Sequence, residues 1–362
     1  MSLQIPSPTC HTPAGIVLDG FVDSDVPASP TGVSIDPEPA EADARRGVMD
    51  LTLTLRHGGS RTLALHYEFI GTLSAPVVLV AGGISADRHV AGSRAFPQAG
   101  WWDAQCGPGR ALDPRHRCVL SFDWIGSDGS LDLPIDPADQ AEAVAALLDH
   151  LGVHRLDAFV GCSYGAMVGL QFAALYPARL RRLVAISGCH RPHPYASAAR
   201  ALQRRAVALG ALQCDGSHGL ALARQLAMLG YRTPEEFQLR FGGATVVNGA
   251  VRVDAEDYLD HCGAIYADKV HPVAFTRLSE SIDLQDVDPR QIDVPVTVVA
   301  VADDRIVPLA DACELVEDLP SGARLRILHS RFGHDAFLKE HAAVADVLVE
   351  SLAGAPGAEE VA

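Results

Sequence analysis

At 362 residues the chain is long enough to bury a full hydrophobic core, either as one large domain or as two. Hydrophobic residues make up 48% and charged residues 20% of it, as in a soluble globular protein. The 29 basic and 45 acidic residues give a net charge of −16, which argues against general nucleic-acid binding and requires any anionic substrate to meet a local basic patch.

The first part of the chain predicts an extension followed by strands that alternate with helices. Residues 1–46 are rich in Pro, Ser, Asp and Glu with little periodicity, which is typical of a flexible extension. From residue 49 to 72, apolar and polar residues alternate around Gly58-Gly59, which predicts a β-hairpin. Apolar runs predict further strands at residues 76–81, 118–124, 156–160 and 180–187. One helix is expected to run to about residue 150 and to begin at Asp136-Pro137, with Asp136 as its N-cap and Pro137 in the first helical position. Another helix is expected at residues 166–176.

Residues 194–288 interrupt this rhythm with a mostly helical segment. Beyond it, two more strands and a closing helix are predicted at residues 295–302, 325–328 and 336–352. Because strands that alternate with helices form a parallel sheet covered by helices, we predict an α/β domain built from residues 47–193 and 289–353. The segment 194–288 would then be a helical lid on that domain, and residues 354–362 a C-terminal tail.

Residues 161–165 read Gly-Cys-Ser-Tyr-Gly, a G-x-S-x-G motif between a predicted strand and a predicted helix. That context is typical of a nucleophile elbow, a sharp turn that flanking glycines make possible. The elbow would present the hydroxyl of Ser163 at the top of the sheet, beside a helix N-terminus that favours negative charge. Cys162 points elsewhere in such a turn, so we assign it no catalytic role.

The chain after the lid supplies an acid and a base, in the order Ser, Asp, His. Asp303 and Asp304 directly follow a predicted strand, at the edge where parallel sheets hold their active sites. His334 follows the next strand, in a loop beside a glycine. We expect His334 to take the proton of Ser163, with Asp304 holding the imidazole in the right tautomer and Asp303 as the rival for that place. The alternative is that the two acids only cap a helix and that His334 is a surface residue.

A developing oxyanion needs two backbone N–H donors. The residue after the nucleophile, Tyr164, should supply one of them. The other should come from the loop after residues 76–81, where we favour Ile84 over Gly83, unless Gly82-Gly83 is an ordinary tight turn. Together these groups predict acyl transfer through an acyl-serine on an α/β-hydrolase fold, with a mostly parallel central sheet flanked by helices and a helical lid insertion.

Several other blocks resemble those of a known family. They are residues 100–102 (Gly-Trp-Trp), 107–113 (Gly-Pro-Gly-Arg-Ala-Leu-Asp), 334–338 (His-Asp-Ala-Phe-Leu) and the lid segments 222–224 (Leu-Ala-Arg) and 231–233 (Tyr-Arg-Thr). From about residue 48 to 352 the chain resembles the homoserine O-acyltransferases, the acetyl- and succinyltransferases of methionine biosynthesis within the α/β-hydrolase fold.

The resemblance implies a role for each candidate residue. Ser163 is the nucleophile, His334 the base and Asp304 the acid, because the family's D-x-x-x-P spacing fits Asp304. Asp335 would bind the amine of homoserine and Arg224 its carboxylate, which suits a zwitterion that needs one acid and one base. The alternatives are a solvated lid-helix arginine for Arg224 and a helix N-cap for Asp335.

Two departures from the family pattern bear on the substrates. The family's elbow usually reads GGSMGGM, whereas residues 161–167 read Gly-Cys-Ser-Tyr-Gly-Ala-Met. The family also has a segment with an asparagine followed by LGGC and GSTGP, whereas residues 123–130 here read Asp-Trp-Ile-Gly-Ser-Asp-Gly-Ser. We expect acyl transfer from acyl-CoA to homoserine, with succinyl slightly favoured over acetyl and serine as an alternative acceptor. An esterase or thioesterase stays open, because the same groups serve water. A catalytically silent scaffold also stays open, although the ordered triad argues against it.

Compartment and partners follow from weaker signals. No apolar stretch approaches the ~20 residues that span a bilayer, and the N-terminus lacks the pattern of a secretory signal. None of the eight cysteines stands in C-x-x-C spacing, so we expect no bound metal. With the acidic charge balance and the lack of a membrane span, we expect a reduced cytoplasmic enzyme that binds neither nucleic acid nor membrane. The resemblance implies acyl-CoA and homoserine as small-molecule partners, no bound cofactor, and a homodimer. Because CoA is anionic, we expect Arg204 and Arg205 of the lid to meet its phosphates, unless they only solvate a helix face.

Overall fold

The computed structural model describes residues 43–212, 216–320 and 323–353. The predicted tail at 354–362 and most of the predicted extension at 1–46 lie outside these residues. The first strand begins at Ala44, so the end of the segment expected to be an extension belongs to the sheet. In the described part of the chain, no helix is both long enough and apolar enough to cross a membrane.

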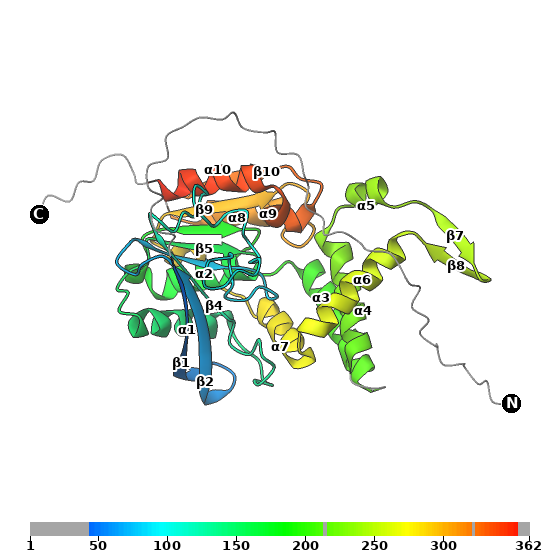
Figure 1. Cartoon of the computed structure of the whole chain (residues 1–362), viewed down its shortest axis with the longest axis horizontal. Helices are drawn as coiled ribbons and strands as arrows, with labels where there is room; N and C mark the ends of the chain where they lie inside the picture. Colours follow the sequence, from blue (N-terminus) through cyan, green and yellow to red (C-terminus); the bar gives the residue numbers. More distant parts are fainter. Residues whose placement is uncertain (1–42, 213–215, 321–322, 354–362) are drawn as a thin grey trace, which may run out of the picture. The chain divides into compact units, whose positions relative to one another are not determined.

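A central sheet of eight strands is formed by the described residues, in the order β1-β2-β4-β3-β5-β6-β9-β10 (Figure 1). The strands are β1 (Ala44–Leu55), β2 (Gly59–Ile70), β3 (Val77–Ala81), β4 (Cys118–Phe122), β5 (Ala158–Cys162), β6 (Leu183–Ile186), β9 (Val296–Val301) and β10 (Arg324–Leu328). β1 and β2 form the predicted antiparallel hairpin and β2 also pairs antiparallel with β4, whereas the remaining neighbours are parallel. The prediction of a mostly parallel central sheet is therefore confirmed.

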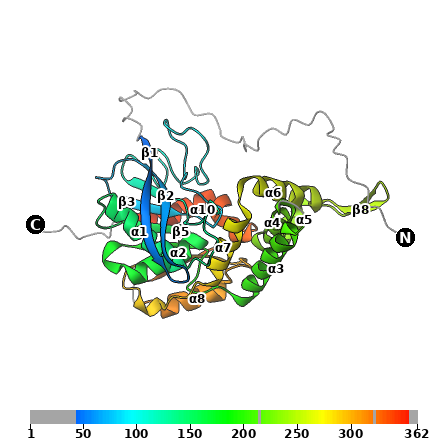
Figure 2. The same cartoon turned by 90° about the horizontal axis from the view of Figure 1, so that it is seen from below.

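Helices cover both faces of this sheet (Figure 1, Figure 2). α1 (Pro137–His150), α2 (Tyr164–Leu175) and α8 (Leu309–Asp318) pack into one hydrophobic cluster with residues of the strands, and α10 (His341–Leu352) packs into another. β3, β4 and β5 are buried along their whole length because both faces are covered, which explains why their sequences are apolar except for Ser121.

One predicted helix boundary is kept and one predicted helix is divided. α1 begins as predicted, because Asp136 accepts the N–H of Ala138 and Pro137 takes the first helical position. The predicted closing helix is instead divided into α9 (Ala336–Lys339) and α10. The division falls at Glu340, whose carboxylate accepts a hydrogen bond from the Ser330 hydroxyl.

Residues between β6 and β9 form a mostly helical insertion, called the lid below (Figure 2). It consists of α3 (Pro194–Ala211), α4 (Ser217–Tyr231), α5 (Pro234–Arg240), β7 (Ala244–Val247), β8 (Ala250–Val253), α6 (Ala255–Lys269) and α7 (Pro272–Asp283). The β7–β8 hairpin was not predicted, although its turn carries a known signal. Asn248 and Gly249 have φ angles of 51° and 79°, and Asn-Gly is the preferred pair where both turn residues need positive φ.

Candidate active site

Ser163 lies in a sharp turn between β5 and α2. Its φ of 56° and ψ of −115° are rarely adopted by residues other than glycine, so the turn is strained. Glycines make the turn possible, because a side chain at Gly161 would collide with the backbone of Gly165, and one at Gly165 with the backbone of Ala81 in β3. The hydroxyl is thereby held between the carboxyl end of β5 and the N-terminus of α2.

A chain of hydrogen bonds joins Ser163, His334 and Asp304. Ser163 Oγ lies 2.8 Å from His334 Nε2, and Nδ1 of the same ring lies 2.7 Å from Asp304 Oδ2. His334 and Asp304 are buried, at 4% and 5% exposed. Asp303 is exposed and makes no contact with the imidazole. The structure therefore brings together the three side chains that the sequence favoured and leaves Asp303 outside.

The Asp304 carboxylate sets the tautomer and the basicity of His334. Because Oδ2 accepts, Nδ1 carries the proton and Nε2 is left to accept from the Ser163 hydroxyl. Burial lowers the pKa of His334, but the charge of Asp304 and its hydrogen bond outweigh burial, so the pKa of the imidazole is raised. The ring of Tyr231 stacks on the imidazole with centroids 5.7 Å apart, a contact that sequence reasoning missed.

The expected N–H donors lie at the same cavity as the serine. Ile84 and Tyr164 both line it, as do Ser163 and His334. Within the described part of the chain, the backbone N–H groups of Ile84 and Tyr164 donate to no other residue, and the same is true of Gly83. Free N–H groups beside a serine hydroxyl are what a developing oxyanion requires.

Trp124 contacts the peptide unit that carries the Ile84 N–H and the side chain of Tyr164. Its indole N–H donates to the carbonyl of Gly83 at 3.0 Å, and that carbonyl belongs to the same peptide unit as the N–H of Ile84. Its ring packs edge-on against Tyr164, with centroids 4.8 Å apart. The Tyr164 hydroxyl in turn lies 2.6 Å from Ser281 Oγ in α7. Sequence reasoning missed this network, which falls in a segment that departs from the family pattern.

The cavity has a volume of about 640 Å³ and is lined by both the sheet domain and the lid. Arg224 of α4 is part of its wall and lies over the rings of Tyr231 and Tyr266, at 5.4 and 4.8 Å from their centroids. Among the described residues, Arg224 has no carboxylate within ion-pair distance. Its guanidinium is therefore available to a ligand anion, in contrast to the alternative of a solvated helix residue.

Asp335 also lies on the cavity wall, but it has a partner. Its Oδ2 is 3.0 Å from Nε of Arg232, without the alignment of a hydrogen bond, and Arg232 also pairs with Glu236 at 3.5 Å. Asp335 precedes α9 without making a capping hydrogen bond, so the N-cap alternative finds no support. A ligand amine at Asp335 would share this carboxylate with Arg232.

Of the two arginines expected to meet CoA phosphates, Arg204 is bound to other lid residues and Arg205 is exposed. Arg204 is half-buried and its Nη1 donates to Asp283 at 2.8 Å and to Ser279 Oγ at 3.0 Å. Only Arg205 of the pair is exposed. Arg204 is thus engaged inside the lid, because it lies on the face of α3 that packs against α7, which the sequence alone did not reveal.

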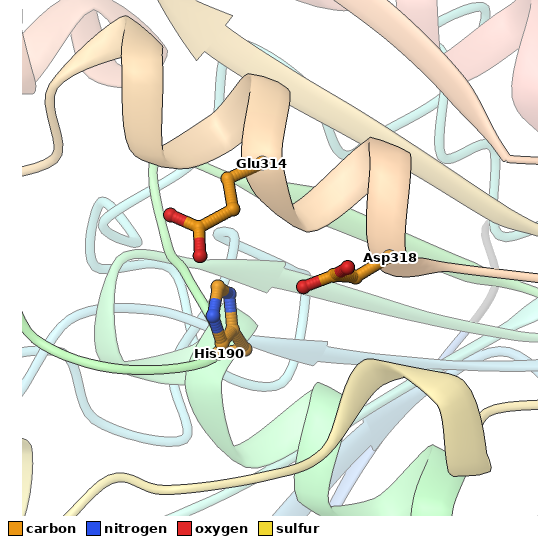
Figure 3. Close-up of side chains that lie close together, drawn as sticks. All are labelled: His190, Glu314 and Asp318. Atoms are coloured by element: carbon orange, nitrogen blue, oxygen red, sulfur yellow. The ribbon is translucent and has the colours of Figure 1, made fainter.

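His190, Glu314 and Asp318 form a separate cluster of possible metal ligands (Figure 3). Glu314 and Asp318 project from α8 toward His190, which follows β6. The cluster already holds a positive charge, because Arg191 donates to His190 Nε2 and to Glu314 Oε2, each at 2.6 Å. Burial and the charge of Arg191 lower the pKa of His190. We therefore interpret this cluster as the surroundings of a partly exposed Arg191–Glu314 ion pair.

Comparisons with known proteins identify the fold and the sequence relatives of the chain. Residues 76–209 match the family model of the alpha/beta hydrolase fold. The chain is 59% identical over 317 residues to a homoserine O-succinyltransferase of Xanthomonas campestris pv. campestris, covering 86% of each chain. It is 33% identical over 330 residues to a homoserine O-acetyltransferase of Thermus thermophilus, covering 78% of this chain and 84% of the other.

Solved structures with a similar fold include both transferases and hydrolases. A homoserine O-acetyltransferase from Bacillus anthracis superposes with a TM-score of 0.79 at 18% identity, over 87% of this chain and 99% of the other. Esterase E22 superposes with a TM-score of 0.76 at 20% identity, over 86% of this chain and all of the other (100%). At these identities the superpositions show the α/β-hydrolase fold, and the choice between transfer and hydrolysis depends on the sequence relatives and on the residues of the site.

Proposed function

The chain belongs to the homoserine O-acyltransferases of the α/β-hydrolase fold, and from that premise we propose that it transfers a succinyl group from succinyl-CoA to the hydroxyl of L-homoserine through an acyl-serine at Ser163. The observation that carries the proposal is the hydrogen-bonded chain from Ser163 through His334 to Asp304, at a strained turn that faces the cavity. The succinyl donor is supported by the 59% identity to a homoserine O-succinyltransferase.

The first half-reaction acylates the serine. His334 Nε2 takes the proton of Ser163 as its Oγ attacks the thioester carbonyl, and Asp304 stabilises the imidazolium that forms. The N–H groups of Ile84 and Tyr164 stabilise the negative charge on the carbonyl oxygen. When the C–S bond breaks, His334 returns the proton to the leaving CoA sulfur, and the acyl group stays on Ser163.

The second half-reaction moves the acyl group to the acceptor. Arg224 binds the carboxylate of homoserine and Asp335 its amine, which places the side-chain hydroxyl near the acyl-serine. His334 takes the hydroxyl proton as the new ester bond forms, and it returns a proton to Ser163 when the old ester bond breaks. The lid covers the cavity and limits the access of water, which would otherwise hydrolyse the intermediate.

Replacing Arg224 or Asp335 by Ala is expected to impair the use of homoserine more than the formation of the acyl-enzyme. Both side chains are assigned to the acceptor, which arrives after Ser163 is acylated. Rapid mixing of enzyme with succinyl-CoA alone measures the first half-reaction as a burst of free CoA. We expect a burst near that of the wild type, followed by slow steady-state turnover with homoserine. Loss of the burst in either variant would show that the residue serves the donor or the fold.

The test of the function as a whole compares acceptors. Free CoA is followed with succinyl-CoA alone, with added homoserine, and with added serine. We expect sustained release only with homoserine. Sustained release without an acceptor would identify a thioesterase, and release with serine alone a serine O-acyltransferase. No release with either succinyl-CoA or acetyl-CoA would leave a non-catalytic scaffold.

The assembly and the cellular role extend the proposal. We propose a homodimer that works in methionine biosynthesis in the cytoplasm, with acyl-CoA as co-substrate and no bound cofactor. The dimer is supported by the uneven distribution of exposed apolar residues. The lid exposes many of them on α3, α4, α5 and the β7–β8 hairpin, including Leu202, Leu209, Leu212, Leu222, Leu239, Val246 and Val251. A concentration of exposed apolar side chains in one segment favours an interface with another protein there.

A further inference from the structure

Two arginines in the lid share a single carboxylate. Arg200 of α3 donates from Nε and Nη2 to Asp283 Oδ1 of α7, at 2.9 and 2.6 Å. Arg204, one turn later on α3, donates from Nη1 to Asp283 Oδ2 at 2.8 Å. The remaining partners of the two guanidiniums are neutral, namely Ser197 and Ser279. The cluster of Arg200, Arg204 and Asp283 therefore carries one positive charge that no residue of the cluster compensates.

This charge is buried and faces the cavity. Arg200 is 8% exposed and lines the same cavity wall as Ser163. Its Nη1 has no hydrogen-bond partner in the described part of the chain. The pKa of His334 is lowered by burial and raised by the charges of Asp304 and Asp335. The charge of Arg200 also lowers this pKa, so Arg200 lies within electrostatic reach of the imidazole. An uncompensated buried charge is costly unless an anion joins it.

Two of the other four arginines on the cavity wall have carboxylate partners. Arg191 pairs with Glu314, and Arg232 pairs with Asp335 and Glu236. Arg305 is exposed and its one hydrogen bond in the described chain goes to a backbone carbonyl. Asp311 of α8 is another carboxylate on the cavity wall, but it makes no ion pair with Arg200 and so does not compensate its charge. Besides the exposed Arg305, two unmatched positive centres remain on the described cavity wall, Arg224 and the Arg200 cluster.

Two carboxylates enter the cavity if the proposed function is correct. One belongs to the amino-acid acceptor and is assigned to Arg224. The other is the distal carboxylate of a succinyl group, which an acetyl group lacks. A guanidinium held in place by a carboxylate is well suited to bind a second carboxylate, because its orientation is already fixed and it has a free N–H edge.

We propose that Arg200, held by Asp283 and supported by the charge of Arg204, binds the distal carboxylate of the acyl group and so selects a dicarboxylic acyl donor over acetyl-CoA. The inference rests on the proposed acyl-serine at Ser163, to which the acyl carbonyl is attached while its carboxylate reaches α3. It makes Arg200 a specificity-determining residue, distinct from the groups that carry out bond making and breaking.

Arg200→Gln tests the assignment by comparing kcat/KM for succinyl-CoA with that for acetyl-CoA. The variant leaves Asp283 and Arg204 as a one-to-one pair, so the lid keeps a balanced ion pair. We expect kcat/KM for succinyl-CoA to fall on the order of 10²-fold, the usual effect of losing a charge-assisted hydrogen bond. The value for acetyl-CoA should stay within about twofold, because an acetyl group has no distal carboxylate for Arg200 to bind. Arg200→Lys should recover part of the succinyl-CoA activity, since it restores the charge without the planar fork.

Arg324→Gln is the matched control, because Arg324 of β10 is an exposed arginine that does not line the cavity. It should leave both donors unchanged. Equal losses for the two donors in Arg200→Gln would overturn the inference and assign Arg200 to the structure of the lid. An unchanged value for succinyl-CoA, or a wild-type preference for acetyl-CoA, would overturn it as well. Failure of the proposed function is distinguishable, because the wild-type enzyme would then release no CoA in response to homoserine.

Discussion

Ser163→Ala is expected to abolish acyl transfer, with turnover falling on the order of 10⁶-fold, as for other nucleophiles of this kind. The substitution removes only the hydroxyl that lies 2.8 Å from His334 Nε2, so no atom remains to form the acyl-enzyme. Steady-state release of CoA with saturating homoserine measures the loss. A variant that keeps more than about a tenth of wild-type turnover would refute Ser163 as the nucleophile.

Ser187→Ala is the matched control for this variant. Ser187 also has a positive φ, 50°, and also lines the cavity, but its hydroxyl has no hydrogen-bond partner among the described residues. Its removal should change turnover by less than about tenfold. Thermal unfolding should be similar for both variants and the wild type, because alanine retains the Cβ at each strained position.

Asp304→Asn is expected to lower turnover by about 10⁴-fold, through the tautomer of His334. Asp304 Oδ1 accepts the backbone N–H groups of Ile306 and Val307, at 2.7 and 3.0 Å. An asparagine would keep its oxygen on these two donors and turn its NH₂ group toward His334 Nδ1. The imidazole would then hold its proton on Nε2, where it cannot accept from the Ser163 hydroxyl.

Asp303→Asn is the neighbouring control, and it should reduce turnover only slightly because Asp303 is exposed and outside the hydrogen-bonded chain. Turnover of the two variants is compared under the same conditions. If Asp303→Asn were the more damaging change, the assignment of the acid would be wrong by one position.

Local patterns predicted the elements that place the nucleophile. The strand at β5, the flanking glycines and the helix at α2 were all expected from adjacent residues, and so was the start of α1 at Asp136. These features depend on backbone sterics and capping, which act over a few residues. The choice of Asp304 over Asp303 came from the resemblance to a family, since both acids follow the same strand.

Contacts between distant segments were beyond the reach of sequence patterns. Arg200 and Asp283 are 83 residues apart, and their pairing depends on how α3 packs against α7. Trp124 and Gly83 are 41 residues apart, in two loops that the parallel sheet brings to one edge. The β7–β8 hairpin is a different case, because the Asn-Gly signal was present but lay within a segment interpreted as helical.

The central claim is a covalent succinyl group on Ser163, and mass spectrometry of the protein tests it most directly. Enzyme is mixed with succinyl-CoA in the absence of an acceptor, quenched in acid, and analysed intact and after proteolysis. The account predicts a mass increase of one succinyl group on the peptide that contains Ser163, and loss of that increase when homoserine is added before quenching. A protein that turns over succinyl-CoA and homoserine while remaining unmodified, or that carries the acyl group on another residue, would contradict it.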